Sequence, residues 1–445
     1  MRDLMPHQEK ALEIIKDKKI VALFMQMRLG KTMTCIRHLS RGDKPKRILI
    51  LTPKSVAPAW KTELFYEEID DDVVEIVTGN STKKIEMLNE SKHMKELWAI
   101  TNYESVIYCP EVLDFNWDVI VLDESTRIKS PKSTTTKMLS QYTTQIPEKM
   151  ILTGCPSPES ELDYFEQIKF LKGTCMGHTN FWHWRTVNFD LVGYDWIIKP
   201  KSLKLLMDEI AEVAVVMTRK DAGLGKKRIY SRRYSFLQKG EQADMYQELC
   251  QDFMTTCLDK EFSTKFVPVQ LEWMSRIASG FSPDGKKILS NEKLKEVEFL
   301  MRGELSKEKV VVWCKHNEEI YAVKNHLESK RFKVGVFMGE DKSGLSDFQS
   351  GKIQVLCGQP MCGKMGIDLS VSSTAIYFSN WWSNEIRMQS EDRILNVRQD
   401  DPLLFIDLIC KYSIEEDIYG AVRSKKIDYN DFTSRLKARI KKMIK

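Results

Sequence analysis

The stretch KIVALFMQMRLGKT, residues 19–32, joins an apolar run to a polar loop. The apolar half is typical of a buried strand, and Gly30, Lys31 and Thr32 match the end of the phosphate-binding pattern G-x-x-x-x-G-K-[ST]. Met25 stands where that pattern has its first glycine. A chance G-K-[ST] occurs in roughly one chain in five of this length, so the surrounding sequence has to decide what the loop does.

Short apolar runs bounded by polar or turn residues recur in two parts of the chain. The first part contains those at 19–26, 47–53, 97–103, 118–124 and 149–154, and the second those at 309–315, 333–339, 353–358, 374–380 and 403–409. Successive runs are separated by enough chain for a crossover helix, which predicts parallel sheets covered on both faces. We therefore expect an α/β fold with two lobes.

The region between the two lobes has a different pattern. Residues 173–285 are rich in aromatic and charged side chains, with helical spacing at 202–220 and 240–262. We expect a first lobe at 1–172, a mainly helical insertion and bridge at 173–285, and a second lobe with a basic tail at 286–445.

The composition is that of a globular protein. The 445 residues are 42% hydrophobic and 29% charged, enough for two or three domains with hydrophobic cores. The longest apolar runs are far shorter than the roughly 20 residues that span a bilayer, and the polar N-terminus lacks a signal region. Ten cysteines without a C-x-x-C pair indicate reduced thiols. These features predict a cytoplasmic protein with no membrane segment.

Two local features leave alternatives open. Cys175, His178 and His183 lie close enough in sequence to hold a metal, but no fourth ligand is evident and the surrounding aromatics favour packing. Residues 421–445 carry nine Lys or Arg against two Asp, on a net charge of +5. This tail fits either a solvated amphipathic helix or a set of DNA backbone contacts. The helix would turn inward the side chains of Leu436, Ile440 and Met443.

Ligands of an open parallel sheet bind at the carboxyl ends of its strands, where two loops carry suitable chemistry. Lys31 would reach the β- and γ-phosphates of a nucleotide, and the Thr32 hydroxyl would ligate Mg²⁺. Asp123 and Glu124 follow another apolar run. Asp123 can hold Mg²⁺ through water, and Glu124 can orient or deprotonate an attacking water.

Eight motifs occur in order along residues 4 to about 416. They are LMPHQEKAL (4–12), RLGKT (28–32), ILTPKSVAPAW (50–60), ITNYES (100–105), VLDESTRIKSPKS (121–133), ILTGCPSP (151–158), MGIDLS (365–370) and QSEDRILNVRQ (389–399). This series resembles that of superfamily 2 helicases and translocases, specifically the Swi/Snf-like branch, in which D-E-A-H-R-I-K-N corresponds to the DESTRIKS here. The resemblance implies two RecA-like lobes.

The resemblance also implies the nucleotide contacts. Gln8 corresponds to the adenine-reading glutamine, which makes ATP the expected nucleotide. The family loop often lacks a glycine at the position of Met25, whereas Arg28 replaces a glycine that the family usually has. The implied ATP-binding residues are Gln8, Arg28, Leu29, Gly30, Lys31, Thr32, Gly366 and Asp368. Thr153 and Gly154 correspond to the motif that couples hydrolysis to lobe movement.

In the second lobe, Gln389 and Arg393 resemble the helix that supplies an arginine finger, a group worth about 10³ to 10⁵ in rate. The family pattern is Q-x-x-x-R-x-x-R, and Asn396 stands at its second arginine. We hypothesise that Arg393 is the essential finger and that Arg398 partly substitutes for the missing one.

The DNA contacts implied by the resemblance are spread over both lobes. They are Thr52, Lys54, Thr101, Tyr103, Arg127, Lys129, Lys315, His316 and Trp382. For Trp382, packing between strand and helix is favoured over base stacking. These residues form no base-reading array, so we expect binding that depends on DNA structure and not on sequence.

The resulting expectation is an ATP- and Mg²⁺-dependent DNA helicase or translocase acting on branched or forked DNA. The compact chain resembles phage or bacterial enzymes of branch migration, fork remodelling and unwinding, which places it in a bacterial or host-cell cytoplasm. One alternative is duplex translocation without strand separation, although the aromatic stretch 179–189 could supply a separating pin. The other is a nucleotide-gated DNA clamp with little turnover, motivated by Arg28 and Asn396.

Overall fold

The structure, a computed structural model, describes residues 2–42, 44–193, 195–252, 254–257, 260–263, 267–339, 341, 343–361, 367–395 and 402–426. The described chain divides into two compact units, which meet in the sequence between Gly225 and Lys226. We call these unit 1 and unit 2. Within the described ranges, no helix is both long enough and apolar enough to cross a membrane.

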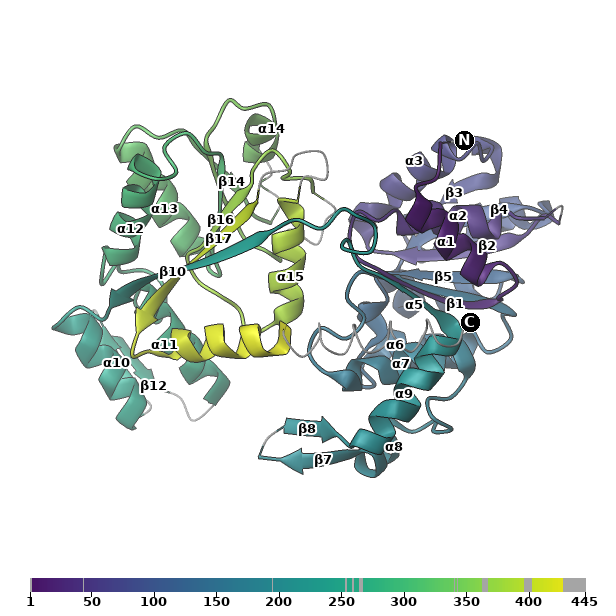
Figure 1. The fold of residues 1–445 in the computed structure, drawn as a ribbon, viewed down its shortest axis with the longest axis horizontal. Helices are drawn as coiled ribbons and strands as arrows, with labels where there is room; N and C mark the ends of the chain where they lie inside the picture. Colours follow the sequence, from purple (N-terminus) through teal and green to yellow (C-terminus); the bar gives the residue numbers. More distant parts are fainter. Residues whose placement is uncertain are drawn as a thin grey trace. The chain divides into compact units, whose positions relative to one another are not determined.

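Unit 1 is a parallel sheet with helices on both faces (Figure 1). Its helices are α1 (Pro6–Ile15), α2 (Lys31–Leu39), α3 (Ala57–Tyr66), α4 (Ser81–Glu90), α5 (Tyr103–Tyr108), α6 (Thr134–Tyr142), α7 (Tyr164–Lys172), α8 (Phe181–Asn188) and α9 (Pro200–Val213). Its strands are β1 (Ile20–Met25), β2 (Arg47–Thr52), β3 (Val74–Ile76), β4 (Leu97–Asn102), β5 (Val119–Asp123), β6 (Glu148–Thr153), β7 (Phe189–Val192), β8 (Asp195–Ile198) and β9 (Ala214–Met217). Short 3-10 helices lie at Lys54–Val56, Asp71–Val73, Ser91–His93, Pro110–Leu113, Ser125–Ile128 and Glu161–Asp163.

The unit 1 sheet has the order β3-β4-β2-β5-β6-β1-β9, and each of its neighbouring strands pairs in parallel. Successive residues of β1 enter opposite cores: Ala22 and Phe24 pack with α7 and α9, whereas Val21 and Leu23 pack with α1, α2 and α3. Burial on both faces explains why these strands are continuous apolar runs. β7 and β8 form a separate antiparallel hairpin.

Unit 2 repeats the scheme. Its helices are α10 (Glu241–Asp252), α11 (Val267–Ser279), α12 (Glu292–Arg302), α13 (Asn317–Ser329), α14 (Ser343–Gln349) and α15 (Asn384–Arg393), and residues 414–426 are also helical. Its strands are β10 (Arg228–Phe236), β11 (Met254–Cys257), β12 (Lys260–Ser263), β13 (Val310–Trp313), β14 (Val334–Phe337), β15 (Val355–Gly358), β16 (Thr374–Tyr377) and β17 (Leu403–Lys411).

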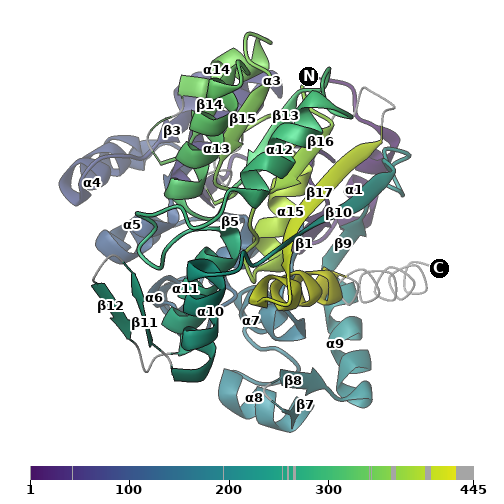
Figure 2. The ribbon, with the colours of Figure 1, turned by 90° about the vertical axis from the view of Figure 1, so that its left-hand side faces the viewer.

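The unit 2 sheet has the order β10-β17-β16-β13-β15-β14, again with parallel neighbours. Helices α12 and α13 cover one face, as Figure 2 shows, and α14 and the residues Ile394 and Leu395, which follow α15, pack on the other. β11 and β12 form a small antiparallel pair. The expected α/β class with two RecA-like parallel-sheet lobes is confirmed.

All ten expected apolar runs contain strands, but two expected helices are wrong at their C-terminal ends. The helical pattern at 202–220 stops at Val213, and Ala214–Met217 instead pairs with β1. The pattern at 240–262 stops at Asp252 and continues as the β11–β12 pair. Both endings contain β-branched residues, which favour strands once a partner strand is available.

The region expected to bridge the lobes is divided between the units. Residues 173–225 belong to unit 1, where β9 forms an edge of the sheet. Residues 226–285 belong to unit 2, where β10 forms an edge. The passage from one unit to the other therefore leads directly from one sheet edge towards another.

Candidate nucleotide site and nucleic-acid interface

The loop between β1 and α2 passes twice through the left-handed region of backbone space. Arg28 has a φ of +66° and Gly30 one of +75°. The left-handed φ of Gly30 favours glycine at this N-cap of α2, and a Cβ atom there would lie 1.9 Å from Gln8 Nε2 and displace that side-chain amide. Met25, where the pattern lacks its first glycine, is the buried last residue of β1. Residues 26–30 thus form the turn that presents the N–H groups of α2 to an anion.

The first turn of α1 supports this loop. His7 Nε2 lies 3.0 Å from the Leu29 carbonyl oxygen, and Gln8 Nε2 donates to the same oxygen at 3.4 Å. Gln8 Oε1 accepts a hydrogen bond of 2.8 Å from Met5 N. The structure therefore brings Gln8 and Leu29, two of the predicted ATP-binding residues, into contact.

The Asp123 carboxylate is held by neutral donors. Thr52 Oγ1 and Trp60 Nε1 donate to Asp123 Oδ2 at 3.0 Å and 2.8 Å, and the Tyr103 hydroxyl donates to the Asp123 carbonyl oxygen at 2.7 Å. Burial, then the nearby charges of Asp123 and Glu124, raise the pKa of Tyr103, so its hydroxyl keeps its proton and remains a donor. Because neutral donors orient a carboxylate without cancelling its charge, Asp123 can still attract a cation.

Glu124 adopts an uncommon backbone conformation. Its φ is +56° and its ψ is +58°, immediately before the 3-10 turn Ser125–Ile128. A non-glycine residue in the left-handed region costs about 1–3 kcal/mol and is often found where a side chain is aimed at a ligand. Arg28 and Glu124 both have this conformation, and both follow strands of the same sheet.

Gly154 lies against the phosphate loop. A Cβ atom there would be 3.2 Å from Met27 Cγ, 3.3 Å from Met27 N and 3.7 Å from Lys31 Nζ. Thr153, the buried last residue of β6, pairs with Phe24 of β1. Of the two predicted coupling residues, Gly154 therefore lies beside the loop that precedes Lys31, and Thr153 lies beside the strand that leads into it.

Three residues of unit 1 that were predicted to contact DNA have buried side chains. Thr52 is 0% exposed and donates to Asp123, and Tyr103 is 2% exposed and donates to the same residue. Thr101 is 2% exposed and its hydroxyl donates to the Val77 carbonyl oxygen at 2.9 Å. Thr52 and Tyr103 thus hold Asp123, whereas Thr101 also lines the pocket described below, and a DNA contact of these three residues stays a prediction.

The predicted cations of unit 1 are more accessible. Lys54 is exposed, and the Arg127 side chain is 37% exposed and lies 3.5 Å from Glu104. The Lys129 side chain is 24% exposed and lies 3.8 Å from Asp163. The long ion pair between Arg127 and Glu104 is weak, so it leaves the Arg127 guanidinium available to a polyanion.

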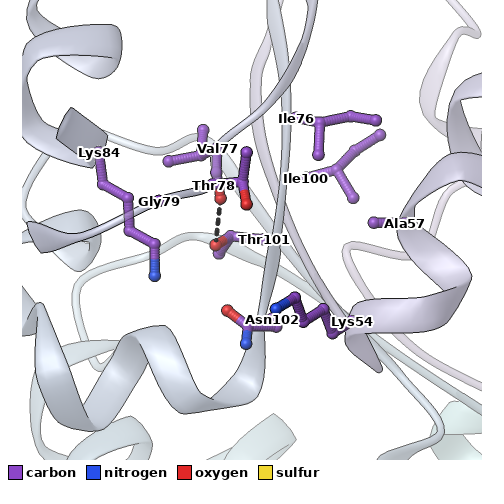
Figure 3. Close-up of a pocket in the computed structure, with 10 residues that line it drawn as sticks. All are labelled: Lys54, Ala57, Ile76, Val77, Thr78, Gly79, Lys84, Ile100, Thr101 and Asn102. Carbon is purple, nitrogen blue, oxygen red and sulfur yellow. Dashed lines mark hydrogen bonds between the residues drawn. The ribbon is translucent and has the colours of Figure 1, made fainter. Parts of the chain in front are cut away.

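A pocket of about 320 Å³ opens beside Lys54 (Figure 3). Figure 3 shows Lys54 and Lys84 reaching in from opposite sides, with Thr101 and Asn102 between them. Lys84 is 8% exposed, and its ammonium donates to Ser105 Oγ at 2.7 Å. Among the described residues no carboxylate is paired with Lys84. A buried cation with a hydroxyl partner in an open pocket is suited to an anion.

The three predicted DNA contacts of unit 2 differ in access. His316 is 6% exposed and burial lowers its pKa, and its contact with DNA stays a prediction. Lys315 Nζ donates to Glu272 Oε2 at 2.5 Å, and its side chain is 9% exposed. Trp382 is 39% exposed, which leaves much of its indole ring accessible.

Helix α15 carries two of the predicted catalytic residues. Gln389 Nε2 donates to Glu385 Oε1 at 3.3 Å, and Arg393 is the buried last residue of the helix. Asp368 is exposed, and its Oδ1 accepts a hydrogen bond of 2.9 Å from Ser370 N. Gly366, Asn396, Arg398 and the basic tail beyond Lys426 lie outside the described residues.

The aromatic stretch 179–189 is mainly core. Phe181, Trp184 and Phe189 are buried, whereas Trp182 is 45% exposed. Cys175 and His178 are joined by backbone hydrogen bonds, and the described residues contain no group of three or more His, Cys, Asp or Glu arranged to hold a metal.

Sequence reasoning missed three residues that shape these sites. They are Trp60, which holds Asp123, Lys84, which lines the pocket, and Arg228, which contacts α15. Trp60 and Lys84 lie on helices whose pattern indicates one buried face, and that pattern does not reveal which polar group each side chain meets. The basic residues between 226 and 233 were visible, but their partners were not.

Comparisons with known proteins agree with these features. The SNF2-related domain matches residues 7–274, more than half of the chain. "Putative protein p41" of Acyrthosiphon pisum secondary endosymbiont phage 1 is 23% identical over 459 residues, covering 95% of this chain and 96% of that protein. "DNA repair and recombination protein RAD54B" of Gallus gallus is 26% identical over 194 residues, covering 39% of this chain and 21% of that protein.

Among solved structures, the "Sulfolobus solfataricus SWI2/SNF2 ATPase core in complex with dsDNA" is similar, with a TM-score of 0.45 and 18% identity over 98% of this chain and 95% of that one. The chain spans between 21% and 43% of the length of the plant, animal and yeast relatives it matches.

Proposed function

The chain belongs to the SNF2-related family, and on that premise we propose that it hydrolyses ATP and uses the energy to move along DNA. One observation carries the proposal: three loops follow the carboxyl ends of neighbouring strands in the unit 1 sheet. Strands β5, β6 and β1 are neighbours, and they end at Asp123, Thr153 and Met25. An acid, a coupling glycine and a phosphate-loop lysine are thereby within reach of one nucleotide.

The residues at these carboxyl ends have separate roles in the proposal. The N–H groups at the start of α2 and the Lys31 ammonium receive the β- and γ-phosphates, and Gln8 reads the adenine. Glu124, aimed by its left-handed backbone, orients and deprotonates the attacking water. Gly154, in contact with Met27 and near Lys31, senses whether the loop is filled.

The oxygen ligands at these carboxyl ends fit Mg²⁺. Thr32 supplies a hydroxyl and Asp123 a carboxylate whose charge is not neutralised by its donors Thr52 and Trp60. These two residues would hold the ion, which neutralises charge on the phosphates when bound.

The proposal assigns DNA backbone binding to the pocket between Lys54 and Lys84. A phosphate in the pocket would meet one exposed and one buried ammonium, and we assign further phosphates of the strand to Arg127 and Lys129. Each phosphate neutralised by a cation adds salt-sensitive affinity without reading sequence. In unit 2 the proposed contacts are Trp382, whose indole ring is accessible, and Lys315, whose ammonium would have to leave Glu272 to reach a phosphate.

We further propose that the preferred DNA is branched or forked, as in recombination, replication or repair in a bacterial or phage-infected cytoplasm. The similarity to a phage protein and to a recombination protein supports this assignment. Translocation on a duplex without strand separation is the alternative. It is favoured by the burial of Phe181, Trp184 and Phe189, which removes most of the expected aromatic pin.

The test is ATP hydrolysis without DNA and with single-stranded, duplex, forked and four-way-junction DNA, with Lys31→Ala as the blank. The proposal predicts turnover that DNA stimulates at least about 10-fold and that the blank abolishes. The strongest stimulation should come from forked or four-way DNA. Turnover no higher than the blank on any DNA would refute the motor and support the nucleotide-gated clamp.

A further inference from the structure

Helix α15 ends in two buried carboxylates next to the proposed finger. Glu391 is 1% exposed and Asp392 is 9% exposed, and Arg393 follows them. Glu391 receives hydrogen bonds from every side. The donors are Arg387 Nε at 2.9 Å, Arg228 Nη1 at 2.6 Å, the Tyr230 hydroxyl at 2.9 Å and Lys426 Nζ at 2.6 Å.

Arg228 contacts both carboxylates at once. Its Nη1 donates to Glu391 Oε2 at 2.6 Å and its Nη2 to Asp392 Oδ1 at 2.5 Å. The planar guanidinium fixes the two acceptors relative to each other, which an ammonium cannot do. Because the acceptors are consecutive residues in the last turn of α15, their orientation sets the direction in which Arg393 leaves the helix.

Arg228 is itself placed by the sheet. It is the first residue of β10, whose nine residues pair with β17 throughout. It is also the third residue of unit 2 after the boundary at Gly225. Lys426, the last described residue of unit 2, contacts the same Glu391 oxygen. The carboxylates of α15 are thus held by the residues with which the chain enters and leaves the unit.

We propose that Arg228 is a positioning residue that holds the Arg393 end of α15 through its two-pronged contact with Glu391 and Asp392. The inference rests on the proposed function, in which Arg393 stabilises charge on the transferred phosphoryl group. It goes further by naming Arg228 as the residue that couples the connection between the two units to Arg393. A movement of that connection reaches α15 through two short charge-assisted hydrogen bonds.

The alternative is that Arg228 only stabilises unit 2, and it makes different predictions. Without Arg228, Glu391 still has Lys426 and Arg387 as partners. Because the buried charge remains paired, Arg228→Met should fold, and its main defect should lie at the end of α15. Arg228→Lys keeps the positive charge but lacks the planar two-pronged geometry of a guanidinium, so it should restore part of the function.

The experiment compares Arg228→Met and Arg228→Lys with Arg233→Met. Arg233 lies on the same strand but pairs at the surface with Glu296 and Glu304. We expect Arg228→Met to lower the DNA-stimulated kcat by about 10- to 100-fold, a fraction of the value of a finger, with the KM for ATP within about threefold of wild type. Arg228→Lys should be intermediate, and Arg233→Met should match wild type.

A second measurement separates this inference from the proposed function. Hydrogen exchange of the amides at 384–393 should be faster in Arg228→Met than in Arg233→Met, whether or not ATP is hydrolysed. A kcat and an exchange pattern equal to those of Arg233→Met would overturn the positioning role. A raised KM for ATP together with a lowered kcat, with unfolding of the whole unit and no rescue by Arg228→Lys, would instead support a purely structural role for Arg228. A wild-type protein without turnover would refute the proposed function and leave exchange alone to decide on Arg228.

Discussion

Two acids, one in each unit, are held in opposite ways. Asp123 in unit 1 is half-buried, and its side chain accepts hydrogen bonds from the neutral groups of Thr52 and Trp60. Asp407 in unit 2 is fully buried, and both of its oxygens accept from Arg387. A carboxylate held by neutral donors can still attract a charged ligand. A carboxylate paired with a guanidinium is already neutralised inside the protein and stabilises the fold instead.

The largest effect should come from making the same substitution at both acids. Asp123→Asn should keep the fold, because an amide oxygen can still accept from Trp60 and Thr52. It should lower ATP turnover by at least about 100-fold, since the amide no longer attracts a cation. Asp407→Asn should instead lower the free energy of unfolding by about 1–3 kcal/mol, because the two hydrogen bonds from Arg387 lose their charged acceptor while Glu391 remains as a partner of Arg387.

Denaturant unfolding and ATP hydrolysis, both measured on both variants, check that Asp123→Asn loses turnover and Asp407→Asn loses stability. An Asp123→Asn protein with full turnover, or one as destabilised as Asp407→Asn, would break the comparison.

The next effect concerns the donors of Asp123. Trp60→Phe retains the ring but removes the indole N–H, so the carboxylate is free to turn. We expect kcat to fall by about 10-fold, equivalent to about 1.4 kcal/mol. Trp98→Phe is the matched control, because Trp98 is equally buried and its indole donates to Glu96. Equal turnover in the two variants would mean that the Trp60 hydrogen bond has no catalytic part.

A smaller effect is expected at the pocket. Lys84→Met should weaken DNA binding by about 3- to 10-fold and reduce the slope of log K against log salt by about 1. Lys83→Met, an exposed neighbour on α4, is the control. Fluorescence anisotropy at several salt concentrations measures both quantities. A slope that changes equally in the two variants would show that the pocket holds no phosphate.

The smallest effect is a pH dependence within unit 2. Burial lowers the pKa of Lys426 from 10.5 to about 8, with Arg228 and Arg387 also lowering it and Glu391 opposing. Between these two pKa values the unfolded chain binds the extra proton, so this lysine makes the free energy of unfolding rise as pH increases from about 8 to about 10.5. Lys426→Met should flatten the rise in denaturant titrations across that range. An unchanged pH slope would mean that Lys426 is not buried among these charges.

Much of the fold was predictable because its strands are buried on both faces. The runs that became β1 and β5 are apolar without interruption, and their loop residues follow from where parallel strands end. Ala214–Met217 was missed because its strand partner, β1, is almost 200 residues away in sequence. A local pattern of apolar and β-branched residues fits the end of a helix equally well.

The candidate sites were predictable only in part, for a similar reason. Lys31 and Gly154 were identified from motifs, and their proximity is a consequence of neighbouring strands. Thr52 and Tyr103 were expected at DNA because their motifs, TPKS and TNY, resemble those that contact DNA in the Swi/Snf-like branch. Their actual partner is Asp123, which a resemblance in sequence could not show.

The central claim is that this chain is a motor that moves along DNA, and displacement of a third strand from a DNA triplex tests it most directly. A protein translocating along the duplex should release the third strand when ATP is present, and Lys31→Ala should not release it. DNA-stimulated ATP hydrolysis without any release, on a substrate with enough duplex to bind, would contradict the claim.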